Sequence, residues 1–100
     1  MIQSDVVVIG GGMAGLMAAL ASAKDGKRVK LLTYGEGTLP LNSGVVDILA
    51  YDAHHQYVEN PIAAIDSLPE DNPYHRIGRK AVEEGIAFFR EVMAAHGLPY

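Results

Sequence analysis

Four consecutive β-branched residues, Val6 to Ile9, open the hydrophobic pattern of the chain. A continuous apolar run of this kind is typical of a parallel strand that is buried on both faces. After a glycine-rich interruption, Met13–Ala23 reads as a helix that is apolar almost all round, which predicts that it is covered on most sides. Val29–Leu32 predicts a second short strand. The order strand, helix, strand indicates a βαβ unit over residues 1–33, with Gly26 at the left-handed end of its helix.

The pattern weakens after the second strand and recovers in the last quarter of the chain. Residues 34–75 combine turn formers, prolines and acidic residues, which predicts a loop-rich connector. Within it, the apolar stretch Val45–Leu49 is expected to form a strand or a short helix, and Asn60 is expected to cap a short helix from Pro61 through Leu68. In the third segment, residues 76–100, a helix is predicted from Arg79 to His96, stopped by Gly97. Its buried face would hold Val82, Ile86, Phe89 and Met93.

The interruption between the first strand and the first helix is a G-x-G-x-x-G arrangement formed by Gly10, Gly12 and Gly15. In a dinucleotide-binding unit the first glycine allows a sharp turn, the second lets the backbone approach a pyrophosphate, and the third lets the helix pack closely on the strand. The helix N-terminus then offers unpaired N–H groups and a positive dipole end. The residues expected to bind a pyrophosphate are Gly10, Gly11, Gly12, Met13, Ala14 and Gly15.

Length and composition narrow the function classes. One hundred residues suffice for one small domain, yet only the first unit of a Rossmann-like α/β fold is evident, so we expect residues 1–100 to be the N-terminal fragment of a larger domain. The formal net charge of −4 gives no attraction to nucleic acid. The absence of cysteine excludes disulfides and thiol redox pairs from this sequence, so redox chemistry would belong to a bound cofactor.

Three other patterns admit a second interpretation. Val6–Ala23 carries no charge and is long enough to span a membrane, but its three consecutive glycines and small alanines favour the βαβ unit, and no basic region precedes it as in a secretory signal. His54 and His55 suggest a metal site but lack a third ligand at suitable spacing, so we expect a solvated loop and no metal. Arg76, Arg79 and Lys80 gather at the start of the last helix. Either Arg79 pairs with Glu83 and Lys80 with Glu84, or the three residues form an anion site.

The end of the second strand is unusual for a dinucleotide-binding unit. Thr33 occupies the position where an acidic residue commonly accepts hydrogen bonds from both ribose hydroxyls. A threonine offers one neutral hydrogen bond, so ribose recognition is weaker here or comes from elsewhere. Glu36 could substitute, although an exposed loop glutamate is the simpler interpretation. The missing acid also argues against a nicotinamide cofactor.

Several segments together narrow the family. Residues 6–37, the segment LNSGVVDILAY from Leu41 to Tyr51, and the segment NPYHRIG from Asn72 to Gly78 resemble the B-type subunits of anaerobic glycerol-3-phosphate dehydrogenase. That family belongs to the flavoproteins related to succinate dehydrogenase and fumarate reductase. The resemblance covers most of the chain, although the family's proteins are several times longer. It also implies that Ser43 and Gly44 approach the flavin ring.

The resemblance implies a flavin-dependent dehydrogenase subunit that oxidises glycerol 3-phosphate to dihydroxyacetone phosphate in anaerobic respiration. The alternative is a flavin-carrying electron-transfer subunit without substrate turnover. Sister dehydrogenase subunits would be its partners, in the cytoplasm or peripherally on the inner face of the cell membrane. FMN is the alternative cofactor, but a pyrophosphate loop favours FAD because FMN lacks the adenosine half. Thr33 and Tyr34 would lie near the adenosine ribose, and the catalytic base would lie beyond Tyr100.

Overall fold

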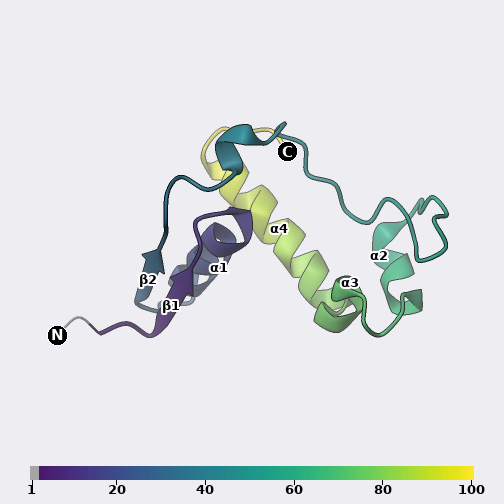
Figure 1. Ribbon diagram of the computed structural model, residues 1–100, viewed down its shortest axis with the longest axis horizontal. Coiled ribbons are helices and arrows are strands. Elements are labelled where there is room, and N and C mark those ends of the chain that lie inside the picture. The colour runs from purple at the N-terminus through teal and green to yellow at the C-terminus, as the bar shows by residue number, and fades with distance from the viewer. Residues whose placement is uncertain (1–2) are drawn as a thin grey trace. The chain divides into compact units, whose positions relative to one another are not determined.

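The computed structural model describes residues 3–100 (Figure 1). These residues belong to two compact units, divided after Val45. Each unit has its own local structure. The first contains both strands and the first α-helix, and the second contains the other α-helices.

The first unit is the predicted βαβ motif. Strand β1 (Val6–Ile9) is followed by helix α1 (Met13–Lys24) and strand β2 (Val29–Leu32). The two strands pair in parallel, with Val6 opposite Val29 and Ile9 opposite Leu32. Gly26 has a φ of 78°, which confirms the left-handed turn that ends the helix segment. The chain then continues through a short 3-10 turn, η1 (Leu39–Leu41).

A pair of charged residues joins the N-terminal ends of the two strands. The Arg28 backbone N–H donates to Asp5 Oδ2 over 2.8 Å, and the Arg28 guanidinium forms an ion pair with Asp5 Oδ1 at 3.2 Å. The backbone N–H of Asp5 in turn donates to the Arg28 carbonyl over 2.8 Å. The hydrogen bonds from Arg28, its side chain first, hold the pKa of Asp5 below its ordinary value.

The faces of this unit are not closed. Val7 is 53% exposed and Ile9 is 83% exposed, and α1 has no fully buried residue. Burial of β1 on both faces is therefore not found within residues 3–100, because one helix can cover only one face of a two-stranded sheet. Helix α1 is apolar almost all round, but the described residues do not cover it on most sides. These surfaces are of the kind that a larger sheet and further helices bury in a doubly wound fold.

The second unit begins with irregular chain. Val45–Leu49, predicted as a strand or short helix, adopts neither, so this prediction is wrong. The stretch has no partner strand, and one of its backbone N–H groups, that of Leu49, faces the Tyr74 hydroxyl at 3.4 Å. A small turn follows in which Tyr51 and Tyr57 form an isolated antiparallel bridge. Asp52 Oδ1 organises this turn by accepting from the backbone N–H groups of His54 and Gln56.

Short helices then pack against one long helix. Helix α2 (Pro61–Ala64) continues into the 3-10 turn η2 (Ile65–Ser67), and Asn60 Oδ1 accepts from the Ala63 N–H over 3.2 Å, which confirms the predicted cap. Helix α3 (Pro73–Ile77), capped by Asn72, was not anticipated from the sequence. Helix α4 (Arg79–Ala95) agrees with the prediction. Ile65 and Leu68, with 0% and 6% exposure, form the core of this unit.

Two of the cations at the start of α4, Arg79 and Lys80, form ion pairs, and one of the two pairs is as expected. Lys80 Nζ lies 3.9 Å from Glu84 Oε1, which confirms that pair. Arg79 instead contacts Asp66 Oδ2 at 3.5 Å, so its predicted pairing with Glu83 is wrong. Asp66 lies in η2, which packs beside α2 and α3, and its carboxylate satisfies Arg79 in place of one on the same helix. Among residues 3–100, no helix has the length and apolar character needed to cross a membrane.

Candidate cofactor site

The glycine segment turns the chain sharply from β1 into α1. Gly10 has a φ of 120°, a conformation that a side chain would penalise, and its N–H donates to the Leu32 carbonyl over 2.8 Å. The turn therefore begins while the two strands are still hydrogen-bonded. This confirms the conformation predicted for the first glycine of the motif.

Gly15 brings α1 against the turn. A Cβ built on Gly15 would overlap the Gly10 carbonyl oxygen and lie 3.5 Å from Val8 Cγ1. The atom in the way is backbone, which cannot rotate aside as a side chain does. Gly15 thus has the close helix-to-strand packing expected of the third glycine.

Gly12 caps the start of α1 and faces open space. A Cβ at Gly12 would meet no atom within 4 Å, and no side chain caps the helix or places an acid in its first turn. The first helical hydrogen bond runs from the Leu16 N–H to the Gly12 carbonyl, at 3.0 Å. The N–H groups of Met13, Ala14 and Gly15 lie before it and, as in any helix, have no acceptor within the helix. An anion can reach these amides from the open side of Gly12.

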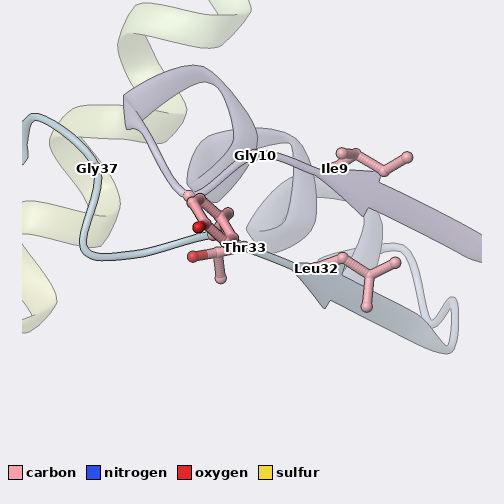
Figure 2. Close-up of a pocket in the computed structure, with 7 residues that line it drawn as sticks. Ile9, Gly10, Leu32, Thr33 and Gly37 are labelled. Atoms are coloured by element: carbon pink, nitrogen blue, oxygen red, sulfur yellow. The ribbon is translucent and has the colours of Figure 1, made fainter.

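A groove of about 370 Å³ lies at the carboxyl ends of both strands (Figure 2). Gly10 and Gly11 line it together with Ile9 and Leu32, the last residues of the two strands. Thr33, Tyr34 and Gly37, from the loop after β2, complete it. The edge at the carboxyl ends of parallel strands is where open α/β sheets bind ligands.

The loop after β2 determines what the groove offers a ribose. The Thr33 hydroxyl donates to the Gly35 carbonyl over 2.6 Å, so toward a ligand it can act only as an acceptor. The Tyr34 side chain is fully exposed, and Glu36 is exposed as well. Four of the predicted cofactor residues, Gly10, Gly11, Thr33 and Tyr34, therefore line one groove.

The predicted flavin-ring residues lie elsewhere in the first unit. Ser43 and Gly44 form a tight turn in which the Gly44 N–H donates to Asn42 Oδ1 over 2.9 Å and the Val45 N–H faces Ser43 Oγ at 3.4 Å. This confirms the turn itself. Neither residue lines the groove at the strand ends, so their approach to a flavin stays a prediction.

Gly37 is a groove residue that the sequence did not single out. Its φ of 74° and its contact with the Gly11 backbone become visible only when the loop is folded. The sequence signal that could have identified it is the pair Gly35 and Gly37. Two glycines separated by one residue after a strand indicate a loop with left-handed backbone conformations.

The histidine pair shows no metal geometry. Among residues 3–100, no three His, Cys, Asp or Glu side chains are grouped so that they could hold a metal. The nearby Asp52 carboxylate accepts backbone N–H groups, first that of Gln56, and these lower its pKa from the ordinary value. Asp52 therefore organises a loop.

Comparison with known proteins agrees with this geometry. Residues 5–100 match the family model described as "FAD binding domain", and the chain belongs to this family. It is also similar to proteins named as a subunit, designated B, of anaerobic glycerol-3-phosphate dehydrogenase. A probable member from Halobacterium salinarum is 44% identical over 89 residues, which are 88% of this chain and 21% of that protein.

Two bacterial relatives carry the same name. The protein of Vibrio cholerae is 35% identical over 102 residues, covering 99% of this chain and 23% of its own. That of Aliivibrio fischeri is 34% identical over 98 residues, covering 95% and 22%. The chain thus spans about a fifth of the length of these curated relatives. No solved structure matches it.

The residues present suit FAD at its pyrophosphate end. A Cβ on Gly12 would point into open space, so an anion can approach there, and the amides at the start of α1 suit an anion. The adjoining groove provides apolar surface from the two strand ends beside one hydroxyl acceptor. A pyrophosphate-binding turn beside a groove at the strand ends is the arrangement with which open α/β sheets bind dinucleotides.

Proposed function

We propose that this chain holds the ADP half of FAD in a flavoprotein dehydrogenase that oxidises glycerol 3-phosphate to dihydroxyacetone phosphate. The observation that supports the cofactor assignment is the open backbone cradle at Gly12, at the start of a helix without acidic residues in its first turn. The support for the substrate is the name shared by the relatives, which describes a glycerol-3-phosphate dehydrogenase subunit. Sister subunits would receive the electrons, in the cytoplasm or at the inner face of the membrane.

Each proposed site residue has a defined task. Gly10 and Gly15 shape the turn, while Gly11, Gly12, Met13 and Ala14 present backbone to the pyrophosphate. Thr33 and Tyr34 border the ribose, and Ser43 and Gly44 approach the ring. Bound flavin supplies hydride acceptance, and the protein supplies position and electrostatics.

A second candidate is an electron-transfer subunit without its own substrate turnover. The relatives are named as one subunit of a larger enzyme, which leaves room for substrate oxidation on another subunit. Assaying the purified full-length gene product with glycerol 3-phosphate and an artificial electron acceptor separates the two. Turnover by this polypeptide alone supports the dehydrogenase, and flavin reduction only in the presence of partner subunits supports the electron-transfer role.

The cofactor itself is tested by identifying, by mass, the flavin released when the full-length gene product is denatured. We expect FAD, because the pyrophosphate cradle and the strand-end groove both require the adenosine half. Recovery of FMN without FAD would contradict the cofactor assignment.

Substituting Gly12 with Asp tests the cradle without disturbing the fold. The new side chain enters open space, and Asp is a favourable N-cap, so the melting temperature should stay level or rise. FAD affinity should fall at least about a hundredfold, because a carboxylate would occupy the place of the phosphates and repel them. The measurement is flavin content together with a thermal melt.

The matched control is Gly12→Asn, which has the same size without the charge. We expect an intermediate loss of FAD from steric blocking alone. Unchanged flavin content in Gly12→Asp would rule out close backbone approach at Gly12.

A further inference from the structure

The peptide bond between Gly11 and Gly12 is supported from one side by the loop after β2. A Cβ placed on Gly37 would lie 3.1 Å from the Gly11 carbonyl oxygen, 3.3 Å from its carbonyl carbon and 3.5 Å from the Gly12 nitrogen. These three atoms make up one peptide group. Gly37 therefore lies beside that peptide, where a Cβ would be crowded and where its φ of 74° already disfavours an L side chain.

Thr33 supports the same region from another direction. A Cβ on Gly11 would lie 3.0 Å from Thr33 Cβ and 3.1 Å from Thr33 Oγ1. The Thr33 hydroxyl donates to the Gly35 carbonyl over 2.6 Å, and this bond ties the start of the loop to its middle. Figure 2 shows the loop leaving Thr33 at the end of β2 and passing back to Gly37 beside the glycine turn.

We propose that Thr33 and Gly37 are positioning residues that fix the orientation of the Gly11–Gly12 peptide for the pyrophosphate of FAD. The inference rests on the proposed function, since it concerns the same cradle. Its basis is the position of Gly37 beside this peptide and of Thr33 beside Gly11, both at or after the end of β2.

The orientation of this peptide matters because its two ends have opposite polarity. The Gly11 carbonyl oxygen is the atom of this peptide nearest the Gly37 Cβ position, and in a trans peptide the Gly12 N–H points the opposite way. An anion is attracted by the N–H end and repelled by the carbonyl end, so a rotation would reverse what the peptide offers the phosphates. Glycine peptides rotate readily, so the glycine turn alone does not select one orientation. Contact with Gly37 on the peptide, and with Thr33 on Gly11, opposes the rotation.

The first test compares two glycines of similar conformation. Gly37 has a φ of 74° and contacts the glycine turn, while Gly26 has a φ of 78° and no atom within 4 Å of its Cβ position. Alanine at either position carries the same backbone strain. In the full-length gene product we expect Gly37→Ala to raise the FAD Kd about tenfold or more and Gly26→Ala to change it less than about twofold.

The second test separates the two parts of Thr33. Thr33→Val keeps the branched contact with Gly11 but loses the hydrogen bond to Gly35, whereas Thr33→Ser keeps the hydroxyl. We expect Val to weaken FAD binding about tenfold and Ser to restore it to within about threefold of the wild type.

Hydrogen exchange in the FAD-free protein distinguishes positioning from direct contact. If Thr33 acts through the loop, Thr33→Val accelerates amide exchange over residues 34–37 and at Gly12 before any cofactor is added. Unchanged exchange in the FAD-free protein would mean that Thr33 only touches the ribose, which contradicts the positioning role.

The outcomes also separate this inference from the proposed function. A wild-type protein that binds no FAD contradicts the proposed function. A wild type that binds FAD, with Gly37→Ala binding it as tightly as Gly26→Ala does, contradicts the positioning role of Gly37 and leaves the proposed function standing.

Discussion

Two helical glycines have opposite surroundings. Gly15 in α1 leaves no room for a methyl group, because the Gly10 carbonyl occupies that space. Gly85 in α4 has no atom within 4 Å of its Cβ position apart from its own helix. At one site the missing side chain is required by packing, and at the other it only weakens the helix.

Alanine at these two positions should therefore shift stability in opposite directions. Gly15→Ala should cost about 1–3 kcal/mol from overpacking, and it should also reduce FAD content because α1 must move from the turn. Gly85→Ala should add about 0.5–1 kcal/mol from helix propensity. Thermal melts of the two variants beside the wild type check both signs. A stable Gly15→Ala protein with full flavin content would contradict the close packing of α1.

At the scale of elements, β1 and β2 are joined at one end by Asp5 and Arg28 and at the other by the Gly10–Leu32 hydrogen bond. The first junction includes an ion pair beside a backbone hydrogen bond, and the second is a backbone hydrogen bond alone. Because Asp5 is exposed, its ion pair is screened by water and salt, so its contribution to stability is small.

The contribution of Asp5 should depend on pH in a defined direction. Arg28 lowers the folded-state pKa of Asp5, so the stabilisation is present above the unfolded-state value near 3.8 and is lost as pH falls through the lowered pKa. Asp5→Asn should therefore melt slightly earlier than the wild type from pH 7 to pH 5, and the gap should close below about pH 4. The control Asp25→Asn should not lower the melting temperature, because a negative charge after α1 opposes the helix dipole. A gap that widens in acid would contradict the pairing.

The sequence predicted those elements whose signals are local. The βαβ unit and α4 followed from periodicity and flanking glycines, and the α2 cap followed from Asn60 before Pro61. Helix α3 was missed although Asn72 and Pro73 provide the same signal, because five residues show no period. Val45–Leu49 was misassigned because an apolar run becomes a strand only when another strand pairs with it.

The candidate site also has features that the sequence predicted and features that it did not. The conformation of Gly10 and the packing of Gly15 follow from the motif, since both act within one turn. The positions of Thr33 and Gly37 beside Gly11 depend on how a loop returns to a turn more than twenty residues earlier in the chain. No pattern in the sequence specifies that return.

At the scale of the whole molecule, apolar surface remains uncovered. Large apolar side chains on β1, β2 and α1 are more than a third exposed in this chain, namely Val7, Ile9, Met13, Leu20 and Leu32. The curated relatives are about five times longer. We interpret these faces as the places where the rest of a FAD-binding domain packs.

Residues 1–100 produced alone should therefore bind the dye ANS more strongly per mole than the full-length gene product. They should also bind FAD much more weakly, because the groove is lined by the ends of β1 and β2 and the loops after them, which form only part of a dinucleotide-binding fold. Dye fluorescence and flavin titration of the two proteins, side by side, make the comparison. FAD binding of equal strength in both would show that the first βαβ unit is sufficient.

The cradle at the start of α1 consists of main-chain amides around Gly12, and this limits how its function can be detected. Alanine scanning locates functional residues by deleting side-chain atoms, and here there is no side chain to delete. An alanine scan would therefore miss the cradle and identify only the residues around it. Mutational maps of this protein will reveal the site through substitutions that add atoms, so intolerance to larger residues, rather than loss of a particular group, is the signature to look for.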